Sequence, residues 1–153
     1  MTDFAMSDMN LDPAAVEAAL AERADQLRAM LGDLIKQNLS GDVLATRSGA
    51  LLNSIETNLE DDGSQIIVTA ASRGVPYAAI LEYGGKTAAH DIVAVKAGAL
   101  AFTAGGTQHF AKTVHHPGST FKAYAYLGGA LEGLADEIRS GLKTAVLQAL
   151  GAS

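Results

Sequence analysis

Residues 75–85 of this chain read VPYAAILEYGG, and residues 114–118 read VHHPG. Each stretch ends a regular segment with residues that force a turn, Gly-Gly in the first and Pro-Gly in the second. The first stretch predicts a short helix that runs to about Tyr83, with Tyr77 and Leu81 on one face. Neither stretch has the residue layout of a catalytic site, so both predict short elements joined by tight turns.

Upstream of this helix the sequence predicts a β-hairpin. Residues 54–60 and residues 65–71 alternate between apolar and polar side chains, which is typical of half-buried strands. The DDGS sequence between them is a turn of the kind that joins antiparallel strands. A short helical segment over residues 47–53 is predicted just before the hairpin.

Long amphipathic helices are predicted near both ends of the chain. The first covers residues 13–39, because Asp12-Pro13 is a helix start and the apolar residues from Val16 to Leu34 step by three, four or seven. The second covers about residues 121–150, with a kink or a close backbone approach expected at Gly128-Gly129. Residues 1–11 are predicted to be a flexible N-terminal arm, and residues 12–153 a single domain.

The segment between these helices predicts further strands. Residues 90–95 are expected to pair with residues 99–103 across Lys96-Ala97-Gly98, and residues 108–115 form another strand. The fold class is therefore α+β, with an antiparallel or mixed sheet of about four to five strands. The long N-terminal helix, the short central helix and the long C-terminal helix are expected to pack against that sheet.

Composition favours a subunit of an assembly. The 153 residues are 48% hydrophobic, but much of this is alanine, aromatic residues make up only 5%, and tryptophan is absent. A core so poor in large side chains is expected to be modestly stable alone, and oligomerisation would supply the missing buried area.

Charge and cysteine content exclude several kinds of site. The net charge is −6, and the 11 Lys and Arg residues do not cluster into the basic patch that sequence-specific DNA binding requires. An acidic surface can still line a passage for DNA, because repulsion prevents sticking. The absence of cysteine excludes disulfides and thiolate metal sites.

No targeting segment and no run of about 18 apolar residues is visible, so we expect synthesis in the cytoplasm and no membrane partner.

The polar residues do not predict a catalytic or metal centre. His115 and His116 are adjacent, so on a strand their side chains point to opposite faces and cannot share an ion. Glu82 has no carboxylate or histidine partner near it in sequence. It is either a solvated surface group or, since a negative charge is unfavourable at a helix C-terminus, one compensated by Lys86, Arg73 or a backbone N–H group. We expect no enzyme activity, no cofactor and no metal.

Four motifs occur in a specific order along the chain: SGALLNSI at residues 48–55, YAAILEYG at 77–84, KAGALAF at 96–102 and VHHPG at 114–118. In this order they resemble the tail-component family of long-tailed phages and prophages, whose members are called neck, head–tail joining or tail-completion proteins. The resemblance covers roughly residues 44–150. It assigns structural or interface roles to Ser48, Gly49, Leu51, Ser54, Ile55, Tyr77, Glu82, Gly84, Gly85, Phe102, His116, Pro117 and Gly118.

The resemblance implies a structural protein of the virion, assembled in the host cytoplasm. It implies a ring, of six subunits in the expected form, at the junction of head and tail, with head-completion or stopper proteins and terminator or tail-tube proteins as neighbours. DNA would pass through the lumen without sequence-specific binding. Two alternatives stay open: a tail terminator ring that caps the tube at its final length and, more remotely, a small metal-dependent hydrolase using His115 or His116 with Glu82.

Overall fold

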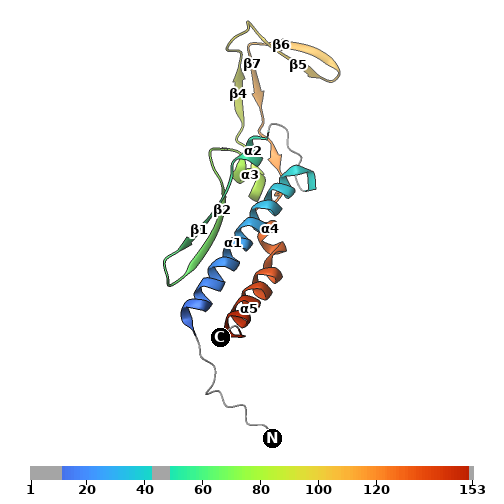
Figure 1. Ribbon diagram of the computed structural model, residues 1–153. Helices are drawn as coiled ribbons and strands as arrows, with labels where there is room; N and C mark the ends of the chain where they lie inside the picture. The colour runs from blue at the N-terminus through green and yellow to red at the C-terminus, as the bar shows by residue number, and fades with distance from the viewer. Residues whose placement is uncertain (1–11, 43–48, 152–153) are drawn as a thin grey trace.

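The computed structural model describes residues 12–42 and 49–151. The molecule is elongated: two long helices and a β-hairpin form a body, and a pair of narrow β-ribbons extends away from it (Figure 1). The predicted flexible N-terminal arm over residues 1–11 and the predicted interface residue Ser48 lie outside the described residues. The α+β class is confirmed.

Helix α1 spans Pro13–Gln37 and begins where the sequence predicts. The Asp12 side chain accepts a hydrogen bond of 3.0 Å from the backbone N–H of Ala14, and proline occupies the first helical turn. A wider turn, η2 (Asn38–Asp42), ends the helix, and Gly41 there has a φ of 126°. Glycine adopts this backbone conformation more easily than other residues.

The predicted hairpin follows a single short helical turn, α2 (Ala50–Asn53). Strands β1 (Ile55–Asp61) and β2 (Ile66–Ser72) are antiparallel, and Ile55 pairs with Ser72. Alternate residues of both strands are partly buried, because one face of the hairpin packs on α1. This part of the sequence prediction is confirmed to within a residue or two.

The middle of the chain contains short helix α3 (Ala78–Tyr83) and six short strands. They are β3 (Gly85–Lys86), β4 (His90–Val93), β5 (Leu100–Ala104), β6 (Thr107–Ala111), β7 (Thr113–His116) and β8 (Thr120–Phe121). Among the described residues, all strands form four two-stranded antiparallel ladders, β1–β2, β3–β8, β4–β7 and β5–β6, instead of one sheet of four to five strands.

The predicted pairing of residues 90–95 with residues 99–103 is wrong. β4 pairs with β7, and β5 pairs with β6 across Gly105-Gly106. This two-residue glycine turn has positive φ angles of 58° and 81°, which suit a tight hairpin between twisted strands. The predicted strand over residues 108–115 is accordingly divided at Lys112 between β6 and β7.

The C-terminal helix begins later than predicted. Residues 122–127 are not helical, and the helical part comprises α4 (Gly128–Gly133) and α5 (Ala135–Gly151). The expected kink at Gly128-Gly129 is wrong, because these residues begin the helix; the irregularity lies at Leu134. The alternative expectation, a close approach by another backbone, is also wrong: a Cβ on Gly128 would meet only the side chain of Glu82, at 3.2 Å from its Oε1, and a Cβ on Gly129 would meet no atom within 4 Å.

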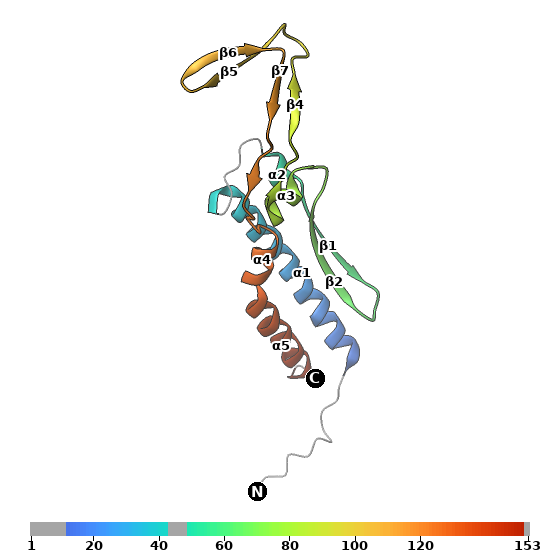
Figure 2. The same ribbon diagram turned by 180° about the vertical axis from the view of Figure 1, so that it is seen from behind.

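The hydrophobic core lies where α1 passes the point at which the two β-ribbons leave the body. Its largest fully buried side chains are those of Ile35, Leu39 and Tyr126, and Leu51 and Leu134 pack with them. α5 runs beside α1 (Figure 2), and an Arg23–Glu137 ion pair links the two helices. The core is therefore small and off-centre, as the low aromatic content leads one to expect.

Candidate functional site

The most distinctive feature of the structure is the extension that comprises residues 90–116, hereafter the β-arm. It consists of the β4–β7 ladder and, beyond it, the β5–β6 ladder, which turns away at the far end (Figures 1 and 2). None of its residues is buried. Two-stranded ladders have little stability of their own in water, and each leaves two edges unpaired.

The β-arm exposes several large apolar side chains. Val95 is 91% exposed, Phe110 is 69% exposed and Val93 is 55% exposed. The Phe102 ring stacks on His109 across the β5–β6 ladder, with ring centroids 5.6 Å apart. Exposed apolar groups gathered on one element are typical of a surface that binds another macromolecule.

His90, His115 and His116 lie near the base of the β-arm, in the part of the β4–β7 ladder next to the body. All four histidines of the chain lie on the β-arm, and its charged residues are Asp91, Lys96 and Lys112. His115 Nδ1 lies 2.8 Å from Asp91 Oδ1, and the rings of His90 and His116 stack with centroids 5.2 Å apart. The acidic surplus of the chain therefore belongs to the body and the termini.

Glycines hold the base of the β-arm against the body. Gly84 has a φ of 72°, and a Cβ there would lie 2.8 Å from the backbone nitrogen of Ala123. Gly118 has a φ of 86°, and a Cβ there would lie 2.2 Å from the carbonyl oxygen of Thr87. Both positions thus require glycine, because a side chain would collide with the backbone of the neighbouring segment.

Glu82 connects this region to the C-terminal helix. Its side chain is 7% exposed, and its Oε2 and Oε1 accept hydrogen bonds from the backbone N–H groups of Leu127 (2.9 Å) and Gly128 (2.8 Å). These N–H groups belong to the start of α4, where a carboxylate also interacts favourably with the helix dipole. Of the two expectations for Glu82, compensation by a backbone N–H is confirmed and a solvated carboxylate is wrong.

The SGALLNSI motif forms the other side of the same region. The Ser54 hydroxyl donates to the Leu51 carbonyl oxygen at 2.7 Å and lies 2.7 Å from the Ser72 hydroxyl. Arg73 N–H donates to the Ser54 carbonyl oxygen at 3.0 Å. The motif therefore joins α2 to the start of β1 and to the end of β2.

Tyr126 lies at the centre of this arrangement, although its burial was not predicted from the sequence. It is 1% exposed, and its backbone carbonyl accepts a 3.1 Å hydrogen bond from Asn38 Nδ2. Burial, followed by the negative charge of Glu82, raises the pKa of the Tyr126 hydroxyl. An aromatic residue just before an apolar helix was the available signal, but burial could not be read from it.

Most of the predicted interface residues converge on the base of the β-arm rather than on a docking surface. Leu51 is buried, Ile55 packs against the core, and His116 Nδ1 lies 3.0 Å from the backbone N–H of Gly118. Gly85 pairs with Phe121 in the β3–β8 ladder. The residues Gly49, Tyr77 and Pro117 lie at the starts or ends of elements in the same region.

Phe102 is the exception, because it lies on the outer ladder of the β-arm. Phe110, more exposed than Phe102, was not singled out. Its exposure depends on the β5–β6 pairing, which differs from the pairing predicted from the sequence.

The residues of the hydrolase alternative have separate partners. His115 contacts Asp91, His116 contacts Gly118, and Glu82 binds the start of α4. Within residues 12–42 and 49–151 there is no group of three His, Cys, Asp or Glu side chains that could hold a metal ion.

No helix among the described residues is long and apolar enough to cross a membrane. Comparisons of the chain with models of known protein families, with curated proteins and with solved structures found no match.

Proposed function

We propose that this chain is a structural subunit of the neck of a long-tailed phage or phage-like particle, where copies form a ring that joins head to tail and lets DNA pass. The observation that carries the proposal is the β-arm: an extended, exposed element with apolar side chains and no core of its own. Such an element gains stability when another subunit covers it.

The positions of the motif residues support this proposal. They fix the base of the β-arm through Glu82, Gly84, Gly118 and the Ser54 hydroxyl, so the arm leaves the body in a defined direction. A defined direction is what a ring needs, because each subunit must reach the next by the same rotation. The net charge of −6 suits a lumen through which DNA slides without sticking.

Solution mass and negative-stain electron microscopy of the purified full chain test the proposal. We expect closed rings of about six subunits, the number implied by the resemblance. Rings would agree with the neck function, and a compact monomer at all concentrations would contradict a chain that assembles by itself.

Deletion of the gene separates the neck from the terminator function. Tails of normal length that never join heads would agree with a joining protein. Overlong tails would overturn that assignment in favour of a terminator.

A further inference from the structure

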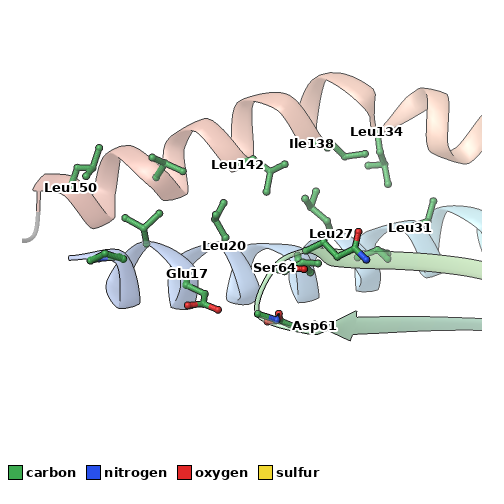
Figure 3. A pocket seen from close by; sticks show the side chains of 18 of the residues that line it. Glu17, Leu20, Leu27, Leu31, Asp61, Ser64, Leu134, Ile138, Leu142 and Leu150 are labelled. Carbon is green, nitrogen blue, oxygen red and sulfur yellow. The ribbon is translucent and has the colours of Figure 1, made fainter. Parts of the chain in front are cut away.

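The body contains a long apolar groove that the base of the β-arm does not use. It has a volume of about 750 Å³ and lies between α1, α5 and the start of β2. Leu20, Leu27 and Leu31 on α1 face Ile138 and Leu142 on α5 across it (Figure 3). A continuous aliphatic surface of this kind, left open to water on a small protein, is typical of a binding site.

The edge of β2 beside this groove is also free. Asp62 N–H donates to the Gln65 carbonyl oxygen, and Arg73 N–H donates to the Ser54 carbonyl oxygen. Since hydrogen-bonded and non-hydrogen-bonded pairs alternate along an antiparallel hairpin, these two bonds show which residues of β2 bond to β1. The backbone groups of Ile66 and Val68 therefore point away from β1, and no described residue pairs with them. A strand can be added there while its side chains enter the groove.

The charges at the groove identify its partner. Among the described residues that line it, the charged ones are Glu17 and Asp61, both acidic and both at the hairpin-turn end. The outer ladder of the β-arm has no Asp, Glu, Lys or Arg between Leu100 and Ala111, and Lys112 follows directly. Lys112 has no ion-pair partner within the described residues.

We propose that the outer β-ladder of one copy docks in the apolar groove of the next copy. Phe110 lies between Leu20 and Leu142 of the neighbour, β6 lies along the free edge of β2, and Lys112 approaches Glu17. This inference rests on the proposed ring. Each subunit inserts its outer β-ladder into one neighbour and binds the outer β-ladder of the other neighbour in its groove. Because the two surfaces differ, the contact is head-to-tail and propagates from copy to copy.

Site-directed cross-linking tests this contact directly, since the chain has no cysteine. Phe110→Cys and Leu142→Cys are prepared as separate full-length proteins, mixed and treated with an oxidant or a short bismaleimide. We expect a covalent heterodimer from this pair. Phe110→Cys mixed with Gln148→Cys is the matched control, because Gln148 lies on α5 but lines a different, polar surface.

Three substitutions give an independent measurement of the same contact. Phe110→Ala should weaken self-association by roughly ten- to a hundredfold, the effect of burying one aromatic side chain. Lys112→Glu and Glu17→Lys should each weaken it, and the double variant should recover most of the loss. Circular dichroism of each variant shows that the body remains folded.

The outcomes separate this inference from the proposed function. Rings without the Phe110–Leu142 cross-link would overturn the docking contact and leave the ring standing. Cross-linked open chains without rings would support the contact and count against the neck function. If neither rings nor cross-links form, both the docking contact and the neck function are overturned. If deletion of residues 2–11 destabilises the body while no cross-link forms, the groove belongs to that segment and the proposal is wrong.

Discussion

The buried carboxylate of Glu82 is the residue on which the C-terminal helix depends most directly. Replacing it by alanine leaves the N–H groups of Leu127 and Gly128 without their acceptor. We expect Glu82→Ala to lower the free energy of unfolding by about 2 kcal/mol, as for loss of a strong helix cap. Glu82→Gln keeps one acceptor oxygen and should lose less.

Urea denaturation followed by circular dichroism measures this loss. Glu132→Ala is the matched control, because Glu132 lies on α4, the helix that Glu82 caps, with its own side chain exposed. Equal effects of Glu82→Ala and Glu132→Ala would mean that the cap does not stabilise the fold.

The neighbouring glycines Gly128 and Gly129 should respond differently to the same change. A Cβ on Gly128 would lie 3.2 Å from Glu82 Oε1, whereas a Cβ on Gly129 meets no atom within 4 Å. Gly129→Ala should therefore gain up to about 1 kcal/mol from helix propensity. Gly128→Ala should be the less stable variant by roughly 1 kcal/mol, because the carboxylate must move. Thermal denaturation of both variants checks the difference, and identical melting temperatures would contradict it.

Asp62 organises the turn between β1 and β2. Its carboxylate accepts hydrogen bonds from the Ser64 hydroxyl, the Ser64 N–H and the Gln65 N–H, which lower its pKa from the usual 3.8 to about 2. Because the folded-state pKa is depressed, the stabilising effect is complete above about pH 4 and is lost as pH falls towards 2.

An NMR titration of the side-chain carboxyl groups measures the Asp62 pKa. Ser64→Ala removes the largest contribution and should shift the pKa upward. A value near 3.8 in the wild-type protein would show that the turn is not formed in solution.

Among the elements, those with local contacts could be predicted and those with distant contacts could not. The β1–β2 hairpin was predictable because its turn and its alternation lie in one stretch of sequence. The pairing of β4 with β7 joins segments that an inserted ladder separates in the sequence, and no local pattern marks the two as partners. The late start of α4 has a similar cause, since Tyr124 and Ala125 are tied to α3 by backbone hydrogen bonds.

The β-arm should be separable from the body as an element. Replacing residues 95–111 with Asn-Gly closes β4–β7 with a two-residue turn, because Ala94 and Lys112 form a hydrogen-bonded pair, and it removes the β5–β6 ladder. No residue of the β-arm is buried, so we expect the free energy of unfolding to change by no more than about 0.5 kcal/mol. This value applies at protein concentrations too low for the subunits to associate. Urea denaturation checks this, and a large loss would mean that the ladder packs against the body.

At the scale of the whole molecule, the residues at the base of the β-arm could be located in the sequence, but neither their arrangement nor the proposed docking surfaces could be predicted. The motif residues could be located because turns and glycines mark them in the sequence. The groove depends on how far apart α1 and α5 lie along their length, and no single residue encodes that separation. An apolar stripe on each helix predicts only that the helices pack, not that they leave room for a third element.

The small core and the open groove together predict that stability depends on concentration. A subunit that binds only folded neighbours is stabilised by about 2.7 kcal/mol when its concentration is a hundred times the dissociation constant. For a chain of this size that corresponds to a rise in melting temperature of roughly 5–10 °C. Circular dichroism over a wide concentration range measures the rise. It is preferred to fluorescence because the chain has no tryptophan to serve as a probe.

The Phe110→Ala variant is the control that identifies the source of this stabilisation. It should melt like the wild-type protein at low concentration, because Phe110 is 69% exposed in the single subunit. At high concentration it should show a much smaller rise, since the docked side chain is missing. If both proteins have the same melting temperature at every concentration, the β-arm does not mediate self-association, and assembly then depends on another surface of the body.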